Sequence, residues 1–399
     1  MEIRFIRERV LVSRRTLLVR GLHFLQMRSA YFLVLLAALP GFAQWQIQAA
    51  PTTADLRGID SVGGGVAWAS GSGGTILRTA DDGAHWQRCA TPPGAEALDF
   101  RGIQAFDAST AIVMSSGKGP LSRLYKTTDA CQSWALVSTN SDPEGFWDAL
   151  QFQHADFGLF SMPGNGIIIG DPLKNAFDVK VTMNIPNASP PRSEGEAWFI
   201  YDPKCFPAKS DEAVFAASNS SLIVFGQSRF MFGTGGKSGA RIISSGLLVG
   251  GVSGDVATSV VVPMAHGTDS AGVFSLFAKS RQQIVAVGGD YLKPDDQTGT
   301  AIFTKDGGKT WAAAPTPPHG FRSAVAYDAA AKTWITVGPN GTDISTDDGR
   351  NWRALRPDPA LGEAADADEH WNALSLPFAV GPQGRIGKLR AGASHAPAR

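Results

Sequence analysis

The chain has 399 residues, of which 45 are glycine and 24 are proline, and only 18% are charged. The glycines follow no three-residue period, which excludes collagen, and the apolar content of 43% excludes an intrinsically disordered chain. The formal net charge is zero, but residues 1–43 hold seven arginines and two glutamates, so the remainder carries a net charge of −5. Such an acidic body argues against nonspecific nucleic-acid binding.

Residues 1–43 are predicted to be an export signal. The run Tyr31–Phe42 contains 12 residues, which is typical of the apolar part of a secretory signal and too short for a permanent membrane span. Gly41 and Ala43 suit the −3 and −1 positions of a cleavage site, so the mature chain is expected to comprise residues 44–399. After cleavage we expect no membrane span.

The length of this leader leaves two interpretations open. Translation could start at Met27, which gives a compact signal, or the segment Ser13–Leu18 could be a twin-arginine export motif. We favour the start at Met27, because His23 and Arg28 interrupt any apolar run behind the paired arginines. Both interpretations predict a periplasmic or secreted protein, and no cysteine follows the apolar run to carry a lipid anchor.

Four segments share the pattern Ser/Thr-x-Asp-x-Gly-x-x-Trp, which we call the Asp-box. Their aspartates are Asp81, Asp129, Asp306 and Asp347, and their tryptophans are Trp86, Trp134, Trp311 and Trp352. In the second box Cys131 replaces the glycine. The aspartate can accept hydrogen bonds from N–H groups of its own turn, glycine permits positive φ, and the tryptophan packs where the next strand begins. The boxes are therefore predicted to brace hairpin turns and to take no part in catalysis.

The box spacing predicts a β-propeller. Trp86 and Trp134 lie 48 residues apart, and Trp311 and Trp352 lie 41 apart, which suits a blade of four strands. Seven segments look like first strands of blades, beginning at Leu56, Phe100, Phe146, Phe215, Val273, Phe321 and His370. The last blade is too short for four strands, so Trp45–Gln48 is expected to supply its outer strand and close the ring. The predicted fold is an all-β, seven-bladed propeller.

Blades three and four are the least certain part of this pattern, because neither contains an Asp-box. Six or eight blades therefore remain alternatives. Residues 186–209 contain five prolines and are predicted to be a loop insertion between these two blades. The three cysteines include no Cys-x-x-Cys pair, so no zinc site is predicted. We expect three small buried side chains, with one disulfide as the alternative in an oxidising compartment.

Several motifs resemble the photosystem II stability/assembly factor family, and in particular its branch in non-photosynthetic bacteria. They are the Leu-Arg-Gly-Ile and Phe-Arg-Gly-Ile blade starts, Ile169–Pro172, Phe232–Gly236, Val287–Tyr291, Val337–Gly341 and Val380–Gly384. The resemblance implies an exported, non-catalytic propeller that binds membrane-protein assembly intermediates. No cofactor is implied, and we expect a monomer. The insertion, the two blades without boxes and Cys131 depart from the family pattern.

Propeller topology predicts which residues share a face. The first strands of the blades begin on one face, the turns between second and third strands return to it, and the Asp-boxes lie on the opposite face. The residues predicted to share the first face are Arg57, Arg101, Arg322, Asp148, Asn372, Asp171, Asp290 and Tyr291. The three arginines, at matching blade starts, could bind a carboxylate, a phosphate or an acidic peptide segment. Alternatively, each could pair with a neighbouring aspartate and brace the channel.

The rival interpretation is a sialidase-like glycoside hydrolase or a carbohydrate-binding propeller. Sialidases use a tyrosine nucleophile, an acidic partner and three arginines that bind the substrate carboxylate. Tyr291 is the tyrosine expected on the arginine face. The sequence has no Arg-Ile-Pro signature near its start, no His-Glu-x-x-His and no Gly-x-Ser-x-Gly. We therefore favour a scaffold without catalytic residues and without a metal.

Overall fold

The computed structural model describes residues 44–152, 166–182, 198–225, 229–245 and 256–390. The chain divides into two units, Met1–Pro40 and Gly41–Arg399, and all of the described residues belong to the second. The predicted export signal and residues 186–197 of the predicted insertion lie outside the described residues. No helix within these described ranges is long and apolar enough to cross a membrane.

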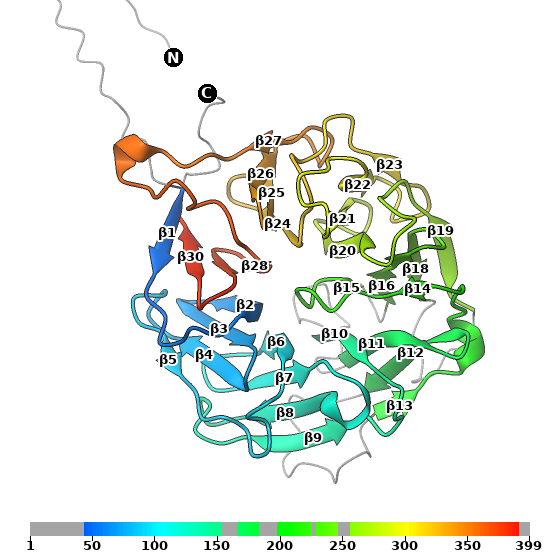
Figure 1. The fold of residues 1–399 in the computed structure, drawn as a ribbon, viewed down its shortest axis with the longest axis horizontal. Helices are drawn as coiled ribbons and strands as arrows, with labels where there is room; N and C mark the ends of the chain where they lie inside the picture. The colour runs from blue at the N-terminus through cyan, green and yellow to red at the C-terminus, as the bar shows by residue number, and fades with distance from the viewer. Residues whose placement is uncertain (1–43, 153–165, 183–197, 226–228, 246–255, 391–399) are drawn as a thin grey trace, which may run out of the picture. The chain divides into compact units, whose positions relative to one another are not determined.

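The second unit is a seven-bladed β-propeller, as the sequence predicted (Figure 1). Blades one to three comprise β2 (Leu56–Gly63), β3 (Val66–Gly71), β4 (Thr75–Thr79) and β5 (Gln87–Arg88), then β6 (Phe100–Ala105), β7 (Ala111–Ser115), β8 (Arg123–Thr127) and β9 (Ala135–Thr139), then β10 (Trp147–Phe152), β11 (Gly166–Leu173), β12 (Ala176–Thr182) and β13 (Trp198–Ile200). Blade four comprises β15 (Leu222–Phe225), β16 (Arg229–Gly233), β18 (Arg241–Ser244) and β19 (Thr258–Val261).

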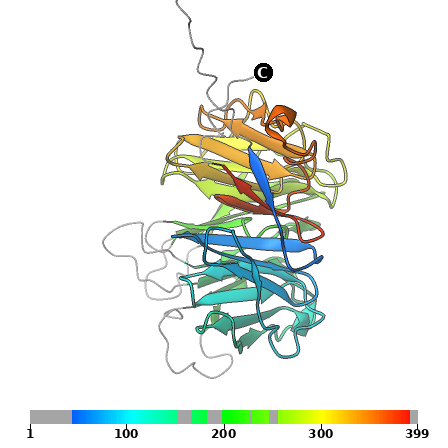
Figure 2. The same ribbon diagram turned by 90° about the vertical axis from the view of Figure 1, so that its left-hand side faces the viewer.

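Blades five to seven complete the ring. They comprise β20 (Ala271–Ala278), β21 (Ile284–Asp290), β22 (Ala301–Thr304) and β23 (Ala312–Ala313), then β24 (Ala324–Asp328), β25 (Thr333–Gly338), β26 (Gly341–Ser345) and β27 (Arg353–Ala354), then β28 (Ala373–Ser375), β29 (Phe378–Val380), β30 (Ile386–Leu389) and β1 (Trp45–Gln48). Two short strands, β14 (Glu212–Ala213) and β17 (Gly235–Gly236), extend the sheet of blade five. Single 3₁₀ turns occur at Gly119–Leu121, Pro203–Cys205 and Pro359–Leu361. Seen from the side, the strands run from one face of the ring to the other (Figure 2).

The core lies between neighbouring blades. β7 and β21, the second strands of blades two and five, are buried along their whole length, so they contain runs of apolar residues instead of the alternation of a half-exposed sheet. Trp68, Trp147, Trp334 and Trp371 are fully buried in these interfaces. Burial of such large side chains is the main stabilising contribution to each blade contact.

The two ends of the described chain meet in blade seven, which confirms the predicted closure. β1 pairs antiparallel with β30, with Trp45 opposite Leu389. The rings of Trp45 and Trp371 lie 5.1 Å apart, and the Trp45 Nε1 group donates to the Thr342 hydroxyl of blade six. A ring closed in this way leaves no open edge at the seam.

The four Asp-boxes form one turn geometry between the third and fourth strands of their blades. In the third box the Thr304 hydroxyl donates to Asp306, the N–H of Gly308 donates to Thr304, and Asp306 accepts from the main chain and side chain of Thr310. The other three boxes repeat these bonds around Asp81, Asp129 and Asp347. Each box thus provides hydrogen-bond partners for the polar groups of its own turn.

These turns make the propeller sensitive to acid. The pKa values of Asp81, Asp129 and Asp306 fall from 3.8 to about 2. For Asp129 and Asp306 the main cause is the hydrogen bond from the side chain of the residue four positions later, and for Asp81 it is the main-chain N–H of that residue. Since the same carboxyl groups titrate at a higher pH in the unfolded chain, the stability that these hydrogen bonds contribute is present above about pH 4. It is lost as the pH falls towards 2.

Urea unfolding at pH 6, 4 and 3 should show this loss of stability. Asp306→Asn should lower the free energy of unfolding at pH 6, but that free energy should then decline less in acid than it does in the wild type. An unchanged acid response in this variant would contradict the assignment.

Blade four starts later than predicted. Its first strand begins at Leu222 and not at Phe215, because residues 214–221 run along the centre of the ring first. We call them the central segment. Ser218 donates to the carbonyl of Ser323 in blade six, Asn219 accepts from the Leu150 N–H of blade three, and Ser220 donates to Ser275 of blade five. The predicted insertion also differs, since its residues 198–200 form the outer strand of blade three.

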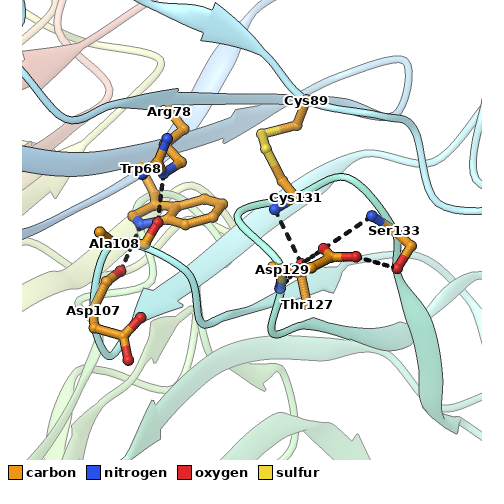
Figure 3. Close-up of a disulfide and its surroundings, with 9 residues drawn as sticks. All are labelled: Trp68, Arg78, Cys89, Asp107, Ala108, Thr127, Asp129, Cys131 and Ser133. Carbon is orange, nitrogen blue, oxygen red and sulfur yellow. Dashed lines mark hydrogen bonds between the residues drawn. A yellow bond between two sulfur atoms is a disulfide. The ribbon is translucent and has the colours of Figure 1, made fainter.

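Cys89 and Cys131 form a disulfide, so the expectation of three buried thiols is wrong (Figure 3). It ties the end of blade one to the Asp-box of blade two, where Cys131 takes the glycine position with a φ of 64°. Cys205 is buried and takes no part in it. Sequence spacing alone could not reveal this pairing, because it depends on how the two blades are placed side by side.

Candidate functional site

A cavity of about 610 Å³ opens on the face where the inner strands begin. We call it the arginine cup. Six of the residues predicted to share this face line it: Arg57, Arg101, Asp148, Asp171, Tyr291 and Asn372. Phe215, Phe274, Phe321 and Trp371 also contribute to the lining. The cup therefore combines guanidinium groups, carboxyl groups and aromatic rings.

β-Bulges direct the polar side chains towards this cavity. The pairing register of the inner strands shifts between Leu56 and Gly58, between Phe100 and Gly102, and between Trp147 and Ala149. The extra residues at these bulges are Arg57, Arg101 and Asp148. A bulge leaves one residue without a partner in the ladder and changes the direction of its side chain, and bulges often occur beside functional sites. The glycine after each arginine lets the neighbouring chain approach, since a Cβ on Gly58 would lie 2.6 Å from the Ser70 hydroxyl.

The two cup arginines are held by a shared carboxylate. Arg101 donates from Nε to Asp99 at 2.8 Å and from a terminal nitrogen to the carbonyl of Ala216 at 3.2 Å. Arg57 lies 3.8 Å from Asp99 and 3.9 Å from Asp55, and its buried Nε has no hydrogen-bond partner among the described residues. The Arg57 and Arg101 side chains are 31% and 29% exposed. Arg101 thus braces the central segment as well as facing the cup, whereas the contacts of Arg57 are the two longer ion pairs with Asp55 and Asp99.

In the part of the chain that the structure describes, three aspartates line the cup. Asp269 is ion-paired with Lys237, whereas Asp148 and Asp171 are neighbours with few compensating contacts. Asp148 is 1% exposed, and its Oδ2 has no hydrogen-bond partner among the described residues. Asp171, the extra residue of a bulge in β11, accepts from the Val214 N–H at 3.2 Å. Burial raises the pKa of Asp148 well above 3.8, and the Asp171 charge adds to this; burial also raises the pKa of Asp171 to about 6.

An aromatic cluster forms the other wall. Phe215 of the central segment stacks on Phe274 with ring centroids 4.0 Å apart, and Phe321 meets Phe274 edge to face at 4.7 Å. Tyr291, with a centroid 6.0 Å from Phe274, is 48% exposed. Phe274 is again the extra residue of a bulge, in β20. Sequence reasoning missed this wall, although the Phe215 motif was singled out as a blade start.

Arg322 does not reach the cup, so its expected place at the opening is wrong. Its side chain is fully buried and donates to Asp343 from Nε at 2.8 Å, to the side chain of Asn340 at 2.6 Å and to the carbonyl of Phe321 at 2.6 Å. β24 begins only at Ala324, so Arg322 precedes the strand and is not a bulge residue like the other two arginines. The alternative role, bracing, describes its contacts.

Asp290 also lies outside the cup. It is 7% exposed and accepts hydrogen bonds from the Ser270 hydroxyl and the Leu292 N–H, which fix the turn that carries Tyr291. Asn372 lines the cup and donates to the Leu56 carbonyl at 2.8 Å, so it also joins blades seven and one. The eight predicted residues therefore divide into six at the cavity and two behind it.

The central segment separates the cup from a second cavity. This cavity, of about 450 Å³, lies towards the other ends of the inner strands and is lined by Ser218, Asn219 and Ser220 of the segment. Most of its other lining side chains are apolar, such as Leu276 and Val325. Within the described ranges, Asp60 is the one charged residue in this lining, so the charged groups of the two cavities are concentrated on the arginine side.

Comparison with known proteins adds information about the fold. No protein-family model and no curated protein matches the chain. Among solved structures it is similar to YCF48 bound to D1 peptide, with 13% identity, a TM-score of 0.56, and coverage of 87% of this chain and 97% of that one. YCF48 from Cyanidioschyzon merolae has 16% identity, a TM-score of 0.56, and coverage of 87% and 99%. The WD40 propeller domain of Doa1 has 12% identity, a TM-score of 0.52, and coverage of 89% and 100%. At these identities the likeness establishes the propeller fold.

Proposed function

We propose that this protein is an exported, non-catalytic scaffold whose arginine cup binds an acidic segment of a protein partner. The observation that carries the proposal is the pair of bulged arginines on adjacent blades. Both line one open cavity, and their side chains remain 31% and 29% exposed. A carboxylate in the cup would be attracted to both guanidinium groups and could accept hydrogen bonds from them.

The aromatic wall narrows the class of ligand. Carboxylate groups would lie against Arg57 and Arg101, and an apolar side chain next to them would pack on Phe215 and Tyr291. A peptide in which acidic residues flank an aromatic residue has this combination. Among macromolecular ligands it fits better than a nucleic acid, whose affinity would need a larger basic surface than two arginines on an acidic body.

The partner is proposed to be a membrane-protein assembly intermediate outside the cytoplasm, bound by a monomer. The family resemblance in the sequence supports this class of partner, and the similar YCF48 structure contains a D1 peptide. The signal-like segment 1–43 supports export. The Cys89–Cys131 disulfide is also typical of an oxidising compartment.

Replacing both cup arginines should remove binding and leave the fold intact. We expect the double variant Arg57→Gln and Arg101→Gln to bind a rhodamine-labelled Asp-Asp-Phe-Asp-Asp peptide at least roughly tenfold more weakly than the wild type, because two charge-assisted hydrogen bonds are lost. Fluorescence anisotropy measures the affinity. The variant should remain folded and should lose less thermal stability than Arg322→Ala, since both side chains are part-exposed, although Arg101 also donates to the Ala216 carbonyl.

A charge-matched control separates the cup from general electrostatics. Arg88 and Arg350 are exposed and lie away from the cup lining, so Arg88→Gln with Arg350→Gln removes the same charge without touching the site. This control should bind like the wild type, and it should retain any protein captured from periplasmic and membrane fractions that the cup variant loses. Equal losses in both variants would refute a site in the cup.

The hydrolase alternative rests on Tyr291, which is half exposed on the wall of a cavity that aspartates also line. Sialidase chemistry needs three arginines around the substrate carboxylate, and Arg322 is fully buried against Asp343. We therefore expect no turnover of fluorogenic sialosides or other glycosides by the purified protein. Turnover that disappeared in Tyr291→Phe would favour the hydrolase.

A further inference from the structure

Asp148 and Asp171 form a carboxyl pair in the lining of the arginine cup. Both line the same cavity as Arg57 and Arg101, and both are extra residues of bulges, in the paired strands β10 and β11. Asp148 is almost completely buried and its Oδ2 lacks a hydrogen-bond partner among the described residues. An ionised carboxylate in such a place would be poorly solvated and incompletely compensated.

The charged groups around Asp148 come from several strands. Asp171 of β11 and Asp178 of β12 disfavour its ionisation, although Asp178 pairs with Lys180. Arg101 of β6 favours ionisation, but it is already hydrogen-bonded to Asp99. Arg57 of β2 lies on the same cavity and is also ion-paired to Asp99. Burial is the largest influence and raises the pKa of Asp148 well above 3.8, so the surroundings of this side chain favour the neutral acid.

Binding of an anion changes the balance at this carboxyl pair. The anion adds negative charge to the cavity that both carboxyl groups line, and it occupies the guanidinium charges that could otherwise compensate an ionised Asp148 or Asp171. We propose that the arginine cup binds its anionic ligand together with a proton, which is held on the Asp148–Asp171 carboxyl pair. The inference rests on the proposed function and states how that site is regulated: acid promotes capture and higher pH promotes release.

The direction follows from linkage. A bound anion raises the pKa of the pair above its value in the empty cup. The affinity for the anion is therefore highest at a pH low enough for the pair to be protonated in both the empty and the occupied cup. It declines as the pH passes through the titration of the empty cup, where the pKa of Asp171 is about 6, and reaches a lower plateau above the titration of the occupied cup. Each unit of pKa difference between the two states corresponds to a tenfold change in affinity.

The test is the pH dependence of binding of the rhodamine-labelled Asp-Asp-Phe-Asp-Asp peptide. Its carboxyl groups remain ionised from pH 5.5 to 8.5, as does the arginine pair. We expect the wild type to lose roughly tenfold in affinity across this range. In lightly buffered solution near pH 6.5, mixing protein and peptide should also take up protons, which a pH electrode records.

Two isosteric substitutions test whether the pH dependence of binding comes from the carboxyl pair. Asp148→Asn imitates the protonated acid, and Asp171→Asn keeps an amide oxygen that can accept from Val214. We expect the double variant Asp148→Asn with Asp171→Asn to bind at every pH as tightly as the wild type does at pH 5.5, without proton uptake. Arg88→Gln with Arg350→Gln should keep the pH dependence of the wild type.

The outcomes separate this inference from the proposed function. If the wild type binds the peptide with equal affinity at all pH values and takes up no proton, proton coupling is wrong while the site stands. If the double asparagine variant keeps the full pH dependence, the carboxyl pair is not its source and the inference is again wrong. If the wild type fails to bind at pH 5.5, where coupling would favour it most, the proposed function itself is wrong and the inference falls with it.

Discussion

Arg322→Ala is expected to destabilise the propeller by about 3–5 kcal/mol, because it leaves a buried carboxylate without its main partner. Arg322 and Asp343 are 0% and 1% exposed in their side chains. His319, which contacts Asp343 through Nδ1 at 2.8 Å, is the remaining basic neighbour. Urea unfolding followed by tryptophan fluorescence measures the loss, which should exceed that of Arg57→Ala, a part-exposed arginine at the matching blade start.

A second variant tests whether the loss of stability comes from the unpaired carboxylate of Asp343. Replacing both partners, as in Arg322→Met with Asp343→Leu, removes the unpaired carboxylate and fills much of the volume. We expect this double variant to be more stable than Arg322→Ala, since buried ion pairs can be replaced by well-packed apolar residues at little cost. A double variant as unstable as the single one would show that the hydrogen bonds to Asn340 and Phe321 dominate instead.

The fold could be predicted because its signals are local and repeated. Each Asp-box encodes its own turn within eight residues, and the closure at Trp45–Gln48 follows from counting strands in a ring. The late start of blade four had no such local signal. Phe215 looks like a first-strand residue in sequence, but the central segment is stabilised by contacts with blades two, three, five and six, which only the assembled ring brings together.

The site could be predicted as a face but not residue by residue. Arg57, Arg101 and Arg322 look equivalent in sequence because each follows an apolar residue at a blade start. Arg57 and Arg101 lie at bulges in the pairing register, and Arg322 does not. Arg322 instead pairs with Asp343, which lies 21 residues further along the chain on another strand. The carboxyl pair could not be predicted from the sequence either, because the burial of Asp148 depends on how neighbouring blades and the central segment pack around it.

Loss of the Cys89–Cys131 disulfide is expected to cost about 4 kcal/mol, an estimate from the chain entropy of a loop closed over a sequence separation of 42. The double variant Cys89→Ser with Cys131→Ser should show this loss in urea unfolding. A reductant should lower the free energy of unfolding of the wild type to the value found for the variant. The bond fastens the outer strand of blade one to the turn of blade two, so its removal should act on the interface between these blades (Figure 3).

The variant Cys89→Ser with Cys131→Gly provides the matched comparison, because glycine is the residue that the other boxes use. The φ of Cys131 is 64°, against 87° for Gly308 and 79° for Gly349 in the equivalent positions. A non-glycine residue in this left-handed region costs roughly 1–2 kcal/mol, so the glycine variant should recover about that amount relative to the serine variant. Both variants should be indifferent to reductant. A glycine variant no more stable than the serine variant would show that a side chain at position 131 packs well enough to offset the backbone strain there. A wild type unaffected by reductant would show that the disulfide is not a stabilising element.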